Sequence, residues 1–141
     1  MFQIIKKIKI NRLENNSALV FERIKQIISE KESQLREELN DKTYSPEAIK
    51  EIEEAIKNLT EPLDVELQFI KLKQKYCNNI DTMQGLAKNW NDYINAILEI
   101  HTLNSQSNMG KVDESSFVEI AKPLLQTRAD VLKKFSILLE E

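Results

Sequence analysis

The amino-acid sequence predicts an all-α fold: an antiparallel bundle of four or five helices, one of them long. Two observations support this prediction. Glycine occurs only twice and proline three times in 141 residues, which leaves few turns and favours long helices over many short strands. Hydrophobic residues recur at intervals of three and four along most of the chain, the spacing that gives a helix one apolar face.

Residues 1–12 form a basic N-terminal segment whose conformation the sequence leaves open. Isoleucines and lysines partly alternate along it, as on the two sides of a strand, whereas Ile5 and Ile8 fit one stripe of a helix. Periodicity does not distinguish a strand from a short helix over so few residues. We expect residues 13–141 to form a single helical-bundle domain.

The first clear helix is expected to begin near Asn16 or Ser17, because both residue types are favourable N-caps. The first half of this helix is strongly apolar. Its second half, over residues 29–39, offers only Leu35 and Leu39 to a core. We therefore expect the second half to project into water or to contact a partner.

A second helix has the clearest start in the chain. Ser45 can cap it, Pro46 takes the first helical position, and Glu47 lies in the first turn. Proline is favourable there because its missing N–H would have no partner within the helix. We expect this helix to end at Glu61, since the following Pro62 disfavours a helical conformation in the residue before it.

A long third helix is expected over about residues 63–103. From Phe69 to His101 the apolar positions keep spacings of three and four, close to a heptad pattern. A break near residues 78–85 stays open, because two asparagines and a glycine in that stretch disfavour helix.

The chain then has a polar segment, residues 102–116, which we expect to be its only real loop. The last helix is expected to open at Ser116, which forms a capping box with Glu119. Pro123 lies inside this helix, so we expect either a kink or two short helices.

No motif for catalysis, metal or a cofactor is found. Cys77 is the only cysteine, so an intrachain disulfide is excluded, and we expect it to pack like a small hydrophobic residue. His101 has no carboxylate or second histidine at the spacing of a helical metal site, and we interpret it as structural or partly exposed. Two isolated glycines form no phosphate-binding loop. We therefore expect no enzyme activity, small-molecule substrate, cofactor or metal.

Charge is unevenly distributed along the chain. Residues 1–12 carry a net charge of +4, residues 43–70 of −5 and residues 71–90 of +3. If the two basic segments pack side by side, they form a strip that can hold a nucleic-acid backbone without reading bases; the alternative is an ordinary solvated surface. The predicted nucleic-acid-binding residues are Lys6, Lys7, Lys9, Arg12, Lys71, Lys73 and Lys75.

Large apolar side chains also recur every seven residues in the region of the long helix. Such a stripe either belongs to the core or forms a docking surface for another helix. With the two leucines of the polar half-helix, it makes up the predicted protein interface: Phe69, Tyr76, Met83, Trp90, Leu35 and Leu39.

These patterns together predict a non-catalytic subunit of a larger assembly, which binds other protein subunits and an RNA or DNA backbone. In size and all-helical make-up the chain is similar to the small subunits of CRISPR effector complexes, and the resemblance implies a place along a guide–target path. The alternative is a stand-alone inhibitor or immunity protein that blocks a toxin or nuclease through the acidic helix.

Compartment follows from what the sequence lacks. We find no signal peptide and no run of about 18 apolar residues that would span a membrane. A lone cysteine suits a reducing compartment. We therefore expect a cytoplasmic protein.

Overall fold

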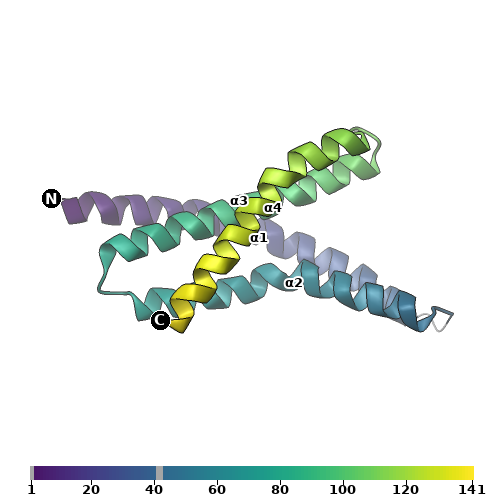
Figure 1. Cartoon of the computed structure of the whole chain (residues 1–141), viewed down its shortest axis with the longest axis horizontal. Helices are drawn as coiled ribbons and strands as arrows, with labels where there is room; N and C mark the ends of the chain where they lie inside the picture. Colours follow the sequence, from purple (N-terminus) through teal and green to yellow (C-terminus); the bar gives the residue numbers. More distant parts are fainter. Residues whose placement is uncertain (1, 41–42) are drawn as a thin grey trace.

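The computed structural model of the chain describes residues 2–40 and 43–141, except for the side chain of Phe2. Over these residues it has four helices and no strand, so the predicted all-α bundle is confirmed. Consecutive helices run in opposite directions and form two hairpins that pack together near their middles (Figure 1). The helices are α1 (Phe2–Leu39), α2 (Pro46–Lys75), α3 (Ile80–Asn108) and α4 (Glu114–Glu140).

The hairpins diverge at one end of the molecule. There the end of α1 (residues 29–39) and the start of α2 (residues 46–55) form one prong, and the end of α3 (residues 100–108) and the start of α4 (residues 114–120) form a second prong (Figure 1). We call these the first and the second prong.

The N-terminal segment is helical, so the strand alternative is wrong for residues 2–12; Met1 lies outside the described residues. Helix α1 passes through Asn16 and Ser17 without ending, and neither is its N-cap. Both side chains instead reach Asn91 of α3, with Asn16 Nδ2 at 2.9 Å and Ser17 Oγ at 3.1 Å from its Oδ1. The side chains of Asn16 and Ser17, which could have capped a helix, are therefore hydrogen-bonded to α3 instead.

The start of α2 is as predicted, but its end is not. Ser45 caps the helix by accepting a hydrogen bond of 3.2 Å from the backbone N–H of Ala48, with Pro46 in the first turn. The predicted end at Glu61 is wrong, because α2 continues through Pro62 to Lys75. Pro62 is fully buried, and we attribute the continuous helix to this burial, which offsets the one missing backbone hydrogen bond.

The expected helix over residues 63–103 is divided between α2 and α3. The chain turns at residues 76–79, which overlap the start of the predicted break at residues 78–85. Asn79 caps α3 by accepting a hydrogen bond of 3.1 Å from the backbone N–H of Thr82. Gly85 remains inside α3. This turn folds the second half of the apolar stripe back onto the first half.

The loop expected over residues 102–116 is much shorter in the structure. Helix α3 extends to Asn108, and only residues 109–113 connect it to α4. The cap of α4 is Asp113, which accepts from the N–H of Ser116 at 2.7 Å, so the predicted capping box at Ser116 is wrong. Pro123 lies inside an unbroken α4, which excludes two short helices.

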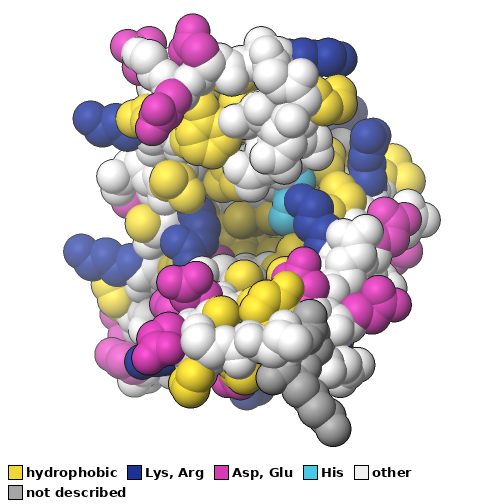
Figure 2. Space-filling view, turned by 90° about the vertical axis from the view of Figure 1, so that its right-hand side faces the viewer, with side chains coloured by type: hydrophobic (Ala, Val, Ile, Leu, Met, Phe, Trp, Pro, Cys, Tyr) yellow, Lys and Arg dark blue, Asp and Glu magenta, His cyan; other side chains and the backbone are white. Residues whose placement is uncertain are grey.

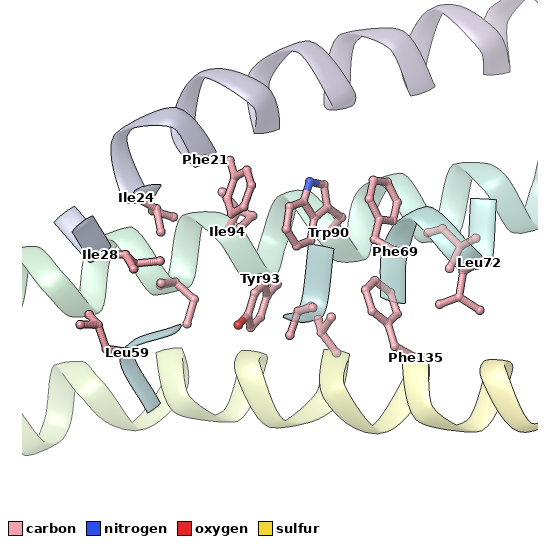
Figure 3. Close-up of a cluster of buried hydrophobic side chains, with 14 residues drawn as sticks. Phe21, Ile24, Ile28, Leu59, Phe69, Leu72, Trp90, Tyr93, Ile94 and Phe135 are labelled. Atoms are coloured by element: carbon pink, nitrogen blue, oxygen red, sulfur yellow. The ribbon is translucent and has the colours of Figure 1, made fainter. Parts of the chain in front are cut away.

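A cluster of buried hydrophobic side chains lies where the two hairpins pack together (Figure 3). Phe69 of α2 and Trp90 of α3 stack with ring centroids 5.2 Å apart. Phe21 of α1 meets the indole edge-on at 5.3 Å, and Phe135 of α4 lies 6.3 Å from Phe69. Tyr93 completes the layer at 5.9 Å from Trp90. Each helix thus contributes to one aromatic layer, which we call the waist.

Candidate functional site

A cleft of about 590 Å³ lies between the two prongs, and all four helices line it. Figure 2 looks into this hollow, with the ends of the two hairpins above and below it. Its interior is apolar, whereas charged side chains and the single histidine stand on its walls (Figure 2). The apolar lining residues include Leu35, Leu59, Pro62, Ile97, Ile100 and Leu125.

On one wall of the cleft lies a carboxylate, Glu61, whose two oxygens both accept hydrogen bonds from other side chains. Arg128 of α4 grips Glu61 of α2 with two N–H groups, one from its Nε to Oε1 at 2.8 Å and one from its Nη2 to Oε2. The hydroxyl of Tyr93 donates to the same Oε1 at 2.9 Å. Such a two-pronged arginine–carboxylate pair is among the stronger hydrogen-bonded contacts in proteins. Through Glu61, Tyr93 and Arg128 this network connects α2, α3 and α4.

The electrostatics of this network shift the pKa values of Arg128 and Tyr93. The hydrogen bond with Glu61 raises the pKa of Arg128. Burial, and then the negative charge of Glu61, raises the pKa of Tyr93, so its hydroxyl remains a donor. The Glu61 charge is therefore fully compensated within the chain.

The opposite wall carries an ammonium beside an imidazole. Lys31 Nζ of α1 lies 3.2 Å from Nδ1 of His101 on α3. Burial, and then the charge of Lys31, lowers the pKa of His101 to about 4. The ring is consequently neutral at pH 7, and its Nδ1 accepts a hydrogen bond from the ammonium. Across the described part of the chain, no carboxylate lies within ion-pair distance of Lys31.

The predicted nucleic-acid strip is only partly assembled. The first turns of α1 do lie beside the end of α2 and the start of α3, but the contacts are ion pairs: Lys6 with Asp81, and Lys73 with Glu14 at 3.6 Å. These pairs neutralise two of the predicted cations.

The other five predicted cations differ in their surroundings. Lys75 donates to the backbone carbonyl of Leu138 at 2.7 Å. The remaining four are exposed and, among the residues that the structure describes, have no carboxylate within ion-pair distance; they are Lys7, Lys9, Arg12 and Lys71.

The predicted protein interface mostly turns inward. Phe69 and Trp90 are buried against each other in the waist, and Tyr76 and Met83 are partly buried around it. The cause is the turn at residues 76–79, which pairs the two halves of the stripe. Of the two leucines on the first prong, Leu35 lines the cleft and Leu39 is half-buried at the end of α1.

A different apolar surface lies on the outer side of α1. The core-facing side of this helix includes the buried Phe21 and Ile24, whereas Ile4, Ile8 and Leu19 are 63%, 52% and 76% exposed. Their spacing of about one to three helical turns places them on a common face. Sequence reasoning missed this surface because only the packed structure shows which apolar side of α1 is left uncovered.

Within residues 2–40 and 43–141, no three His, Cys, Asp or Glu side chains are grouped so as to hold a metal ion. In the same residues, no helix has the length and hydrophobicity to cross a bilayer. The expectation that Cys77 packs like a hydrophobic residue is wrong, since it is exposed at the turn after α2. No family model, curated protein or solved structure matches the chain.

Proposed function

We propose that this chain is a non-catalytic subunit that binds other protein subunits through the outer face of α1. The observation that carries the proposal is the row of exposed apolar side chains Ile4, Ile8 and Leu19. Single exposed apolar residues are ordinary, but these three share one side of α1: Ile4 and Ile8 lie one turn apart, and Leu19 follows about three turns later. The row extends over about 22 Å of helix at 1.5 Å per residue, enough to receive a partner helix.

Basic side chains beside this face support a second part of the proposal, contact with an RNA or DNA backbone. Lys9 and Arg12 are exposed between the apolar residues, and Lys7 is exposed in the same segment. Backbone contact of this kind is electrostatic and weakens as salt is added. It requires no base-reading groups.

The test is native mass spectrometry of the tagged chain drawn gently from its own cells. We expect the chain together with other subunits, and with nucleic acid if the second part holds. The double variant Ile8→Asp, Leu19→Asp should appear as the free chain. The matched control is Ile137→Asp, which changes an exposed apolar residue on α4. If the double variant keeps the same partners as the control, the outer face of α1 is not the interface.

Nucleic-acid binding has its own arm in this experiment. Lys9→Glu with Arg12→Glu should release the nucleic acid while protein partners stay bound, because this variant leaves Ile4, Ile8 and Leu19 unchanged. The control is Lys133→Glu, which changes an exposed lysine of α4. Retention of nucleic acid in the Lys9, Arg12 variant would contradict this part alone.

A stand-alone inhibitor is the second candidate, and one observation favours it. Glu51, Glu53 and Glu54 are exposed on the first prong and, among the described residues, form no ion pair with a basic side chain. Exposed like charges of this kind suit a basic target. A one-to-one complex with a single basic protein, lost on reversal of these glutamates to lysine, would favour the inhibitor over the subunit.

A further inference from the structure

We infer that the cleft between the prongs binds an apolar small molecule with one carboxylate, which Lys31 holds while the apolar part lies on the cleft floor. This inference is independent of the proposed function, because Lys31 and the rest of the cleft lining lie apart from the row formed by Ile4, Ile8 and Leu19.

The size and lining of the cleft suit a small ligand. Its volume of about 590 Å³ lies within the range of roughly 300–1,000 Å³ that is common for such sites. Side chains from both hairpins surround it, and its interior is apolar (Figure 2). Binding sites for small molecules combine such an interior with a few polar groups that fix orientation.

The charge balance of the cleft selects the polar group of the ligand. Glu61 and Arg128 compensate each other, and Tyr93 completes the coordination of Glu61. Lys31 is left with one positive charge and a neutral imidazole as its hydrogen-bond partner. A partly buried charge is costly without a counter-ion, so an anion is the group that this wall lacks.

A carboxylate fits this wall better than a phosphate does. A monoanion balances the single charge of Lys31, whereas a dianion would leave one negative charge unbalanced, because Arg128 is already paired with Glu61. Asn58 and Asn104 also line the cleft, and their side-chain amides can donate hydrogen bonds to the second carboxylate oxygen. The apolar floor provides the rest of the binding free energy.

Sodium octanoate is the probe, used far below the concentration at which it forms micelles, with 1-octanol and octylamine as length-matched comparisons. Isothermal titration calorimetry with the full chain should show one octanoate bound, octanol bound more weakly and octylamine not bound. Lys31→Gln should weaken octanoate binding about tenfold, as expected for loss of a charge-assisted contact. Lys31→Arg should keep most of it.

The control variant is Lys25→Gln, which removes a lysine of the same helix that lies outside the cleft lining. A second measurement locates the ligand without any substitution. The imidazole resonances of His101 should titrate at higher pH with octanoate present, because a negative charge beside the ring stabilises its protonated form. Equal affinity for octanol and octanoate, or unchanged octanoate binding in Lys31→Gln, would overturn the inference; so would the absence of octanoate binding.

Discussion

The waist and the cleft are built from the same four helices, yet one is closed and the other is open. At the waist, rings from every helix meet at centroid distances of 5.2–6.3 Å. At the cleft, Lys31, Glu61, His101 and Arg128 stand on the facing walls. Apolar side chains can close over one another, whereas charged groups need hydrogen-bonding partners or water. The contrast indicates that the waist holds the fold together and that the prongs are left free to form a site.

The largest test of this contrast is Trp90→Ala. The indole contacts Phe21, Phe69 and Tyr93 and is 4% exposed, so its removal should lower the free energy of unfolding by about 3–5 kcal/mol. Phe117→Ala, at a half-buried position on the second prong, is the matched control and should cost about 1 kcal/mol. Urea denaturation measures both. Comparable losses would show that the prongs carry as much of the stability as the waist.

The helical content and its apolar faces were predictable from sequence because they depend on local spacing. The residues at which the helices begin and end were harder to predict, because tertiary contacts there outweigh the local sequence preferences. Pro62 disfavours helix locally, but its burial keeps α2 intact. Asn16 and Ser17 are good caps, but Asn91 of α3 uses their side chains. Asp113 is as good a cap as Ser116 by residue type, and it lies where the chain turns.

The cleft was not predictable because its residues are distant in sequence. Glu61 and Arg128 meet across 67 positions, and Lys31 and His101 across 70. None of these pairs has a local spacing pattern, and each depends on the turn at residues 76–79 that the sequence placed only broadly. The sequence around His101 shows only that no metal-site partner lies at helical spacing from it. Its actual neighbour comes from α1.

The wall with Glu61 offers a second test. Arg128→Ala should lower the free energy of unfolding by about 1–3 kcal/mol, because it leaves a partly buried carboxylate without its partner. The double variant Glu61→Met, Arg128→Met should be more stable than Arg128→Ala, since both charges are then removed. Thermal denaturation at pH 7 compares them. A double variant that is less stable than Arg128→Ala would contradict this explanation. It would mean that the Arg128→Ala variant loses stability because the ion pair is lost, and not because the Glu61 carboxylate is left unpaired.

The opposite wall should make stability depend on pH. The pKa of His101 is lowered to about 4 in the folded chain by burial and then by Lys31, while the unfolded value is near 6.5. The unfolded chain therefore binds the proton first as pH falls from 6.5 to 4, and the folded chain loses stability over that window. We expect a loss of about 1–2 kcal/mol, since the ring is only partly buried and water screens part of the effect.

The variant His101→Gln isolates this contribution, because the amide does not titrate. The difference in the free energy of unfolding between the wild-type chain and the variant should change between pH 6.5 and pH 4 and stay constant above pH 7. Lys31→Gln should reduce the change without abolishing it, since burial is the larger cause. A wild-type chain that loses no more stability than His101→Gln would contradict the neutral imidazole at this wall.

The smallest effect tests whether the prongs move independently of the waist. Ser45→Ala removes the cap of α2 at the tip of the first prong, which should cost about 0.5–1 kcal/mol. Because Ser45 is exposed and immediately precedes the first residue of α2, we expect the loss to appear as local fraying. Native-state hydrogen exchange should show faster exchange at Ala48 and Ile49, while amides of Trp90 and Phe135 keep their protection. If the waist amides lose protection equally, the prong and the waist unfold as one unit, and the cleft cannot open without loosening the core.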